Sequence, residues 1–377
     1  MGDVQVDSRT VAPSLVRAAS MCTYVVVLAW WVRVMGIPKQ ALPAFAWIWL
    51  ATIAWNIVAP WRAHLEFLRD WSIPLAVLTV YLYSRGIADD LGFASVHVTA
   101  PIEVDRRLFG GTLPTEHLQA KLCGNPCDRT SPRQWYDVVL TTVYYSHFVV
   151  ALTIAGVLWL RDRSAWVWFM RRYLALNILA LVVYITYPMA PPWLAAQQGA
   201  ISDHVARITG RGWYDLKAGD FHQKLSAVGN PVAAMPSLHA AVSLFVALYG
   251  ASRLRSRWRW LLLLYPLTMA FTLVYYAEHY VIDILAGYAV TGLVLWGCAR
   301  WERNRAQARS GRVLTEAIPH QVRAFPRQPV SGRSLPGAVS VTAEHIGDEV
   351  EVTFDPARLD VKAVREAIAA AGFCPSP

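Results

Sequence analysis

Two short segments of this sequence combine residue types that can carry out nucleophilic and acid–base chemistry. The first, Ala234–Ala240, reads Ala-Met-Pro-Ser-Leu-His-Ala and places His239 at the mouth of a long apolar run. The second, Tyr275–Gly287, contains His279 and then Asp283 four residues later. Residues i and i+4 share one face of a helix, so Asp283 can orient the His279 ring and stabilise the charge that it develops.

Two imidazoles and one carboxylate are enough to attack phosphorus. One histidine serves as the nucleophile, the other donates a proton, and the carboxylate fixes the tautomer of the nucleophile. A lone histidine in a membrane helix can instead be a packed or hydrogen-bonded residue without a catalytic role. Ionisable groups within a membrane are costly and point to function. We therefore interpret His239, His279 and Asp283, which lie at helix ends within two short segments, as catalytic.

The composition is that of an all-α polytopic membrane protein. The 377 residues are 55% hydrophobic and 16% charged, whereas soluble domains carry about 25% charged residues. The 17 Trp and 16 Tyr residues can form the aromatic belts at the two membrane interfaces. The net charge of +9 does not indicate nucleic-acid binding, because the basic residues lie largely in short loops beside apolar runs, where they set orientation and attract anionic lipid.

Four parts of the chain differ in composition. Residues 1–19 are a polar N-terminal segment, and residues 20–302 are predicted to form a membrane domain of about six to eight transmembrane helices. Residues 303–335 are rich in Arg, Pro and Ser and predict a flexible linker. Residues 336–377 predict two strands, Ala338–Thr342 and Glu349–Phe354, followed by a helix over 360–371, which is a small α+β unit. The first apolar run lacks a small-residue cleavage site and is expected to remain as a helix. The apolar runs are 20–36, 43–61, 71–85, 136–160, 166–188, 237–252, 258–277 and 280–299.

Clusters of arginine predict the orientation of these helices. Basic residues at 161–172, 253–259 and 300–312 belong on the cytoplasmic side by the positive-inside rule. The polar segments 86–134 and 194–235, with the turn at 277–280, then lie on the opposite face. Both histidines are thereby placed on the extracytoplasmic side and the C-terminus in the cytoplasm. The absence of organelle signals and the usage of Arg, Ala and Val favour a bacterial inner membrane.

The five cysteines do not form a disulfide framework. Cys123 and Cys127 flank a Gly-Asn-Pro turn in a polar segment. Outside the cytosol they can form a disulfide, and the alternative is two unpaired thiols. We find no further ligands that would complete a metal site.

The segments Asn230–Ala241 and His279–Gly287 resemble the second and third motifs of the type 2 phosphatidic acid phosphatase superfamily. The Pro-Ser-Leu-His and His-x-x-x-Asp-x-x-x-Gly sequences fit best the branch that contains inositol phosphorylceramide synthase and sphingomyelin synthase, over roughly residues 70–300. The resemblance implies that His279 is the nucleophile and forms a phosphohistidine. It also implies that Asp283 orients His279, that His239 protonates the leaving oxygen, and that neither metal nor cofactor is required.

Further residues are candidates for substrate binding. Ser237 can donate a hydrogen bond to a phosphate oxygen, or act only as a helix N-cap. His147 can line the site, or be a packed helix histidine. Hydrolytic members of the family carry Lys-x6-Arg-Pro and an arginine six residues before the last histidine, but here the first motif is absent and Leu273 fills the second position. This difference favours the transferase branch, and the cations that could meet the phosphate instead are Arg106, Arg107, Arg207 and Arg211.

The tail over Val350–Phe373 resembles the latter part of a heavy-metal-associated domain, which has a ferredoxin-like fold. The metal-binding Cys-x-x-Cys is absent, and Cys374 alone cannot replace a dithiolate. We interpret residues 336–377 as a degenerate, ferredoxin-like half-domain with a structural or interaction role and without metal.

The predicted function is the transfer of a phosphoryl head group from a phospholipid donor to a lipid or polyol acceptor. A lipid phosphate or pyrophosphate phosphatase, in which water is the acceptor, is the first alternative. A non-catalytic lipid-binding or transport protein is the second, and it predicts that the histidines are dispensable.

Overall fold

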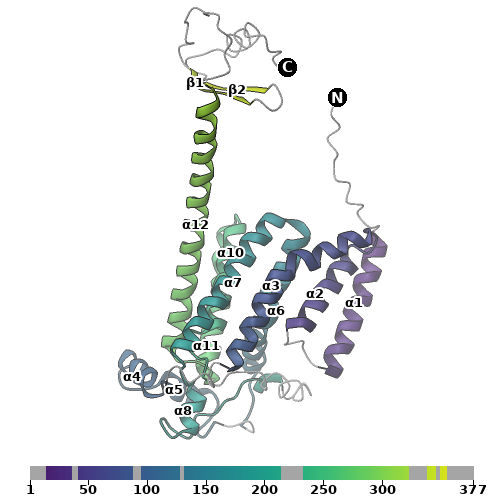
Figure 1. The fold of residues 1–377 in the computed structure, drawn as a ribbon. Helices are drawn as coiled ribbons and strands as arrows, with labels where there is room; N and C mark the ends of the chain where they lie inside the picture. The colour runs from purple at the N-terminus through teal and green to yellow at the C-terminus, as the bar shows by residue number, and fades with distance from the viewer. Residues whose placement is uncertain are drawn as a thin grey trace, which may run out of the picture. The chain divides into compact units, whose positions relative to one another are not determined.

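A computed structural model describes residues 14–35, 41–87, 95–127, 131–213, 232–321, 338–344 and 349–354. These residues form a predominantly helical protein with two paired strands, as predicted (Figure 1). The helices that follow the apolar runs are α1 (Ser14–Met35), α2 (Ala41–Trp55), α3 (Trp61–Ile87), α6 (Trp135–Arg161), α7 (Arg163–Thr186), α10 (Leu238–Arg253), α11 (Leu264–Tyr275) and α12 (Val281–Gln321). Shorter helices are α4 (Thr99–Leu108), α5 (Pro114–Leu122), α8 (Pro192–Gln197) and the 3-10 turns η1 (Arg211–Trp213) and η2 (Arg257–Leu263).

The long helices make this an integral membrane protein. Five of the described helical segments are long and apolar enough to cross a membrane: Leu15–Met35, Trp135–Arg161, Arg163–Thr186, Arg257–Tyr275 and Val281–Ala308. Large apolar side chains stay exposed on these helices and on α3, among them Val26, Ile73 and Leu267. An apolar surface of this kind suits contact with lipid chains, because lipid chains offer no hydrogen-bond partners to polar groups.

The core between the helices is aromatic. Phe67 and Trp71 of α3 stack with ring centroids 4.9 Å apart, Phe45 of α2 meets Trp71 edge-on at 5.1 Å, and Trp159 of α6 meets Phe67 at 5.2 Å. Edge-to-face and offset stacking are the preferred arrangements of aromatic pairs. This cluster joins the N-terminal helices to α6 and α7 and continues to Phe245 of α10.

One end of the bundle carries the short basic turns. Asp162 caps α7 by accepting the Ala165 N–H at 2.9 Å, and the Arg253 guanidinium at the end of α10 lies 3.7 Å from the Asp162 carboxylate. The turns after α6 and α10 are therefore at the same end, as the arginine clusters predict.

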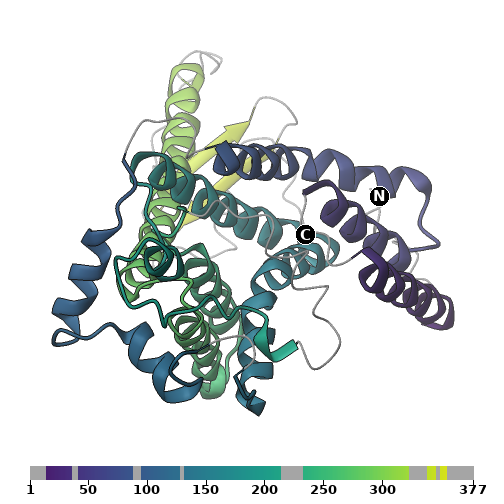
Figure 2. The same ribbon diagram turned by 90° about the horizontal axis from the view of Figure 1, so that it is seen from below.

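The other end carries the polar segments together with the turn between α11 and α12. The Val281 N–H at the start of α12 donates to Asp105 of α4, and the Trp193 N–H of α8 donates to the Ala277 carbonyl. Figure 1 shows α4, α5 and α8 gathered beyond the ends of the long helices, and Figure 2 views this end directly. The described parts of these segments and both histidines therefore lie at the same end of the bundle, as the sequence predicts.

The chain divides into two compact units, residues 1–298 and residues 299–377. Helix α12 continues to Gln321, so residues 303–321 of the predicted linker are helical, and α1 begins at Ser14 within the predicted N-terminal segment. In the second unit, β1 (Ala338–Glu344) and β2 (Glu349–Phe354) pair antiparallel, which agrees with the two predicted strands. Residues 322–337 and the predicted helix over 360–371 lie outside the described residues.

Candidate active site

The start of α10 places His239. Ser237 caps this helix, because its Oγ accepts the Ala240 N–H at 3.3 Å. The residues before the cap are fixed by the segment after α7, since the Met189 N–H donates to the Val232 carbonyl at 2.7 Å. The N-cap role considered for Ser237 is therefore present in the structure, and this role leaves the hydroxyl proton free to donate.

The turn between α11 and α12 places His279. The N–H groups of Glu278 and His279 both donate to the Leu273 carbonyl, at 3.0 and 3.3 Å. Ala277 takes a left-handed conformation with φ of 60°, which reverses the chain at the helix end. Leu273 itself is fully buried. The position that hydrolytic family members fill with arginine thus holds a packed residue that anchors the turn.

His279 and Asp283 face each other, as the i, i+4 spacing predicts. The His279 Nδ1 atom lies 3.4 Å from Asp283 Oδ2, and the same oxygen accepts the Tyr280 N–H at 2.9 Å. Asp283 is fully buried. Because Nδ1 faces the carboxylate, Nε2 is the His279 nitrogen left to react.

Close packing of α10 against α12 brings the two motifs together. The Ser237 N–H donates to the Asp283 carbonyl at 2.9 Å, and Thr291 Oγ1 bonds the Ala241 carbonyl at 2.9 Å. A Cβ at Gly287 would lie 2.4 Å from the Ser237 carbonyl oxygen, so glycine is needed there for the helices to touch. The ring centroids of His239 and His279 are 6.0 Å apart.

Helix α6 covers the His239 ring with two side chains one turn apart. Tyr144 stacks on it with centroids 4.9 Å apart, and His147 lies at 4.1 Å. The structure therefore brings His147 into the site. Sequence reasoning missed the stacking of Tyr144, although its i, i+3 spacing from His147 predicts a shared helix face.

Arg207 lies beside the turn that carries His279. Its Nε and Nη2 atoms donate to the two Glu278 carboxylate oxygens at 2.7 and 3.2 Å, and Thr209 also donates to Glu278. The guanidinium is stacked 4.8 Å from the Trp193 ring centroid. Burial alone would lower the pKa of Arg207, but the Glu278 charge and hydrogen bonds raise that pKa above its usual value. Arg207 therefore stays charged beside the turn that carries His279.

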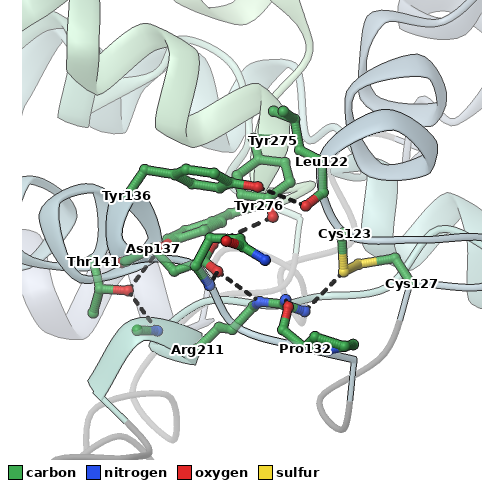
Figure 3. Close-up of polar contacts among 12 residues, drawn as sticks. Leu122, Cys123, Cys127, Pro132, Tyr136, Asp137, Thr141, Arg211, Tyr275 and Tyr276 are labelled. Atoms are coloured by element: carbon green, nitrogen blue, oxygen red, sulfur yellow. Dashed lines mark hydrogen bonds and ion pairs between the residues drawn. A yellow bond between two sulfur atoms is a disulfide. The ribbon is translucent and has the colours of Figure 1, made fainter.

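Arg211 lies inside the protein, in a network that supports the same turn (Figure 3). Its Nε atom is 3.1 Å from Asp137 Oδ2, and both side chains are fully buried. Its Nη1 donates to Cys123 Sγ at 2.8 Å, while the Tyr275 hydroxyl donates to Asp137 at 3.3 Å. Cys123 and Cys127 are joined in a disulfide. Since its donors are used within the protein, we assign Arg211 to the fold and not to substrate binding.

The remaining two cations lie on α4. Arg107 is exposed and pairs with Glu103 at 3.4 Å, one turn away on the same helix. Arg106 is also exposed, and its charge acts on the buried hydroxyl of Tyr280. Burial raises the pKa of Tyr280, and the Asp283 carboxylate raises it further. Arg106 is thus the α4 cation whose charge acts on the catalytic turn.

Two histidines and a buried carboxylate at adjoining helix starts suit phosphoryl transfer on lipids within a membrane. Comparison with protein families agrees, because residues 126–297 match the profile of the PAP2 superfamily. Residues 126–297 are thus similar to the PAP2 superfamily, and the protein is a lipid phosphotransferase or phosphatase. It is 27% identical over 229 residues to a protein of Bacteroides thetaiotaomicron named phosphoinositol dihydroceramide synthase, covering 57% of this chain and 71% of that relative. No solved structure matches the chain.

Proposed function

We propose that the protein transfers a phosphoryl head group from a phospholipid donor to a lipid or polyol acceptor through a phosphohistidine. The observation that carries this proposal is the placement of His279 and His239 with ring centroids 6.0 Å apart, with Asp283 behind His279. A space between two imidazoles suits a phosphorus atom that is attacked from one side and loses its leaving group on the other.

In the first half-reaction, His279 Nε2 attacks the donor phosphorus and an N–P bond forms. The P–O bond to the diacylglycerol oxygen breaks, and His239 gives its proton to that oxygen. Asp283 accepts the Nδ1 proton of His279 in a hydrogen bond, which holds the reactive tautomer and stabilises the positive ring. Stacking against Tyr144 and His147 holds the His239 ring in place.

In the second half-reaction, the neutral His239 takes the proton of the acceptor hydroxyl. The acceptor oxygen attacks phosphorus, the N–P bond breaks, and His279 is regenerated. Negative charge on the phosphoryl oxygens is met by the backbone N–H groups at the start of α10, by Ser237 Oγ and by Arg207. His147 lines the site, and Arg106 meets the head group at its rim.

The name of the Bacteroides relative supports a phosphoinositol donor head group and a ceramide-type acceptor. The lack of the two motif cations of hydrolytic members points in the same direction, toward transfer. We place the site on the extracytoplasmic face of a bacterial inner membrane, with the C-terminus in the cytoplasm. The tail, residues 336–377, is assigned as a ferredoxin-like half-domain that does not hold metal.

The test uses the purified full chain in detergent with phosphatidylinositol labelled in its head-group phosphate and with a short-chain dihydroceramide. The transferase hypothesis predicts that wild type produces a new labelled acceptor lipid and that His279→Ala produces none. Release of water-soluble labelled phosphate ester, with or without acceptor, would identify a hydrolase. Equal behaviour of wild type and His279→Ala in every product channel would support a non-catalytic lipid-binding or transport protein.

Removal of Arg207 is expected to lower kcat/KM by about 100- to 1,000-fold, the effect of losing one preorganised donor to a developing oxyanion. The matched control is Arg107→Gln, which removes an exposed charge on α4 and should leave the rate near wild type. Arg207 has two roles to separate, binding the phosphate and holding Glu278. Glu278→Gln separates them, because it weakens the Arg207–Glu278 pair but keeps the cation. Steady-state kinetics of Arg207→Gln and Glu278→Gln measure this. Equal losses in the two variants would show that Arg207 only holds Glu278.

A further inference from the structure

The first turn of α12 is capped by a side chain from a distant part of the chain. Asp105 of α4 accepts the Val281 N–H at 2.8 Å through Oδ2 and the Ile282 N–H at 3.1 Å through Oδ1. These are the first two residues of α12, and Asp105 is almost fully buried. The first four N–H groups of a helix lack partners within it. The carboxylate that satisfies two of them stands 176 and 177 positions away in sequence.

The candidate nucleophile and its carboxylate lie on either side of these two N–H groups in the sequence. His279 lies two residues before Val281, and Asp283 lies two residues after it. On one side, the turn is fixed to α10 by the Ser237 N–H bond to the Asp283 carbonyl. On the other side, Asp105 fixes it to α4. Helix α4 lies outside residues 126–297, the part of the chain that matches the family profile.

We propose that Asp105 is a positioning residue for the reaction. By holding the start of α12 it fixes the position of the His279–Asp283 pair, and it directs phosphate away from that helix end. The proposal rests on the proposed function of His279. Both carboxylate oxygens occupy N–H groups that would otherwise attract an anion. The substrate phosphate is therefore left to the start of α10 and to Arg207.

Asp105 also places a negative charge beside the catalytic turn. Burial raises the pKa of its carboxyl, and the two backbone hydrogen bonds partly oppose that rise. A nearby negative charge favours protonated imidazole. Loss of this charge should therefore shift the acid limb of the rate profile to lower pH. The other titratable and charged groups around this turn are Arg106 on α4, Glu116 on α5, His239 on α10, Arg207, Glu278, Tyr280 and Asp283.

The experiment compares Asp105→Ala and Asp105→Asn with wild type, in the full chain and with the head-group transfer assay. Asp105→Ala should lower kcat by about 100-fold, the cost of a misplacement of about 1 Å in a reacting pair, while KM changes little. Asp105→Asn keeps one acceptor oxygen without the charge, so it should recover part of kcat and show the downward shift in pH. Glu103→Gln, an exposed carboxylate on the same helix, is the matched control and should match wild type.

One result would contradict the positioning role of Asp105. If the Asp105 variants unfold at lower temperature but the folded fraction keeps the wild-type kcat, KM and pH profile, Asp105 is a structural cap and the proposal is overturned. The His279→Ala variant runs alongside to separate the two claims. If that variant is inactive while the Asp105 variants behave as wild type, only the positioning role falls. If His279→Ala is as active as wild type, the proposed function and the positioning role fall together.

Discussion

Replacing His279 with alanine is expected to abolish head-group transfer, with a loss of about 10⁴- to 10⁶-fold in kcat. Removal of a nucleophile from a group of residues that act as a unit has effects of this order. The variant should fold, because the backbone N–H of His279, which bonds the Leu273 carbonyl, is retained. The measurement is the initial rate of labelled product formation, with thermal unfolding in detergent as a check on the fold.

The control for this result is His204→Ala, which removes an exposed histidine from the same end of the bundle and should leave the rate unchanged. Asp283→Asn gives a graded comparison. An amide can donate to His279 Nδ1 and select the wrong tautomer, which in a comparable triad costs about 10⁴-fold. Retention of more than a few per cent of the activity by His279→Ala would show that another group attacks phosphorus.

Replacing Arg211 with alanine is expected to destabilise the protein by about 3–5 kcal/mol, because it leaves the Asp137 carboxylate buried without its charge partner. The substitution should lower the rate of transfer as well as the stability. Asp137 accepts the Tyr275 hydroxyl at 3.3 Å, and its carbonyl accepts the Tyr276 hydroxyl at 3.2 Å, so the network supports the turn before His279. Thermal unfolding in detergent and the transfer rate should fall together.

Arg107→Ala serves as the control for Arg211→Ala, since it removes the same side chain from an exposed ion pair worth about 0–1 kcal/mol. The double variant Arg211→Met with Asp137→Leu tests the cause, because apolar replacement of both partners should recover part of the stability. A normal unfolding temperature for Arg211→Ala, together with a raised KM, would return Arg211 to the substrate site.

The sequence was sufficient to predict the helices and the shared end of the two histidines. Apolar runs define membrane helices because lipid requires them, and the i, i+4 spacing of His279 and Asp283 fixes their relative position locally. The close contact of α10 with α12 also has a local signal, Gly287, which follows Asp283 by one turn.

The partners from distant segments could not be predicted. Arg207 and Arg211 have the same charge and lie four residues apart in one polar segment, yet one pairs with Glu278 and the other with Asp137, more than 70 residues away in each case. Asp105 meets α12 over an even longer separation. Tertiary packing determines such pairs, and residue type and spacing along the sequence do not predict them.

The sequence also did not predict where α12 ends. The change in composition after residue 302 predicts a linker, yet the helix continues to Gln321. Residues 300–309 read Arg-Trp-Glu-Arg-Asn-Arg-Ala-Gln-Ala-Arg and are mostly strong helix formers. A drop in hydropathy marks where a helix stops being apolar, and it does not mark where the helix ends.

The central claim is that His279 carries the phosphoryl group during transfer. The most direct measurement mixes the enzyme with head-group-labelled phosphatidylinositol without acceptor, stops the reaction rapidly and locates the label by peptide mass spectrometry. We predict an acid-labile adduct on His279 that appears with release of diacylglycerol and disappears into a new lipid when dihydroceramide is added. Rapid turnover of donor with no label on the protein, or with label on another residue, would contradict this account.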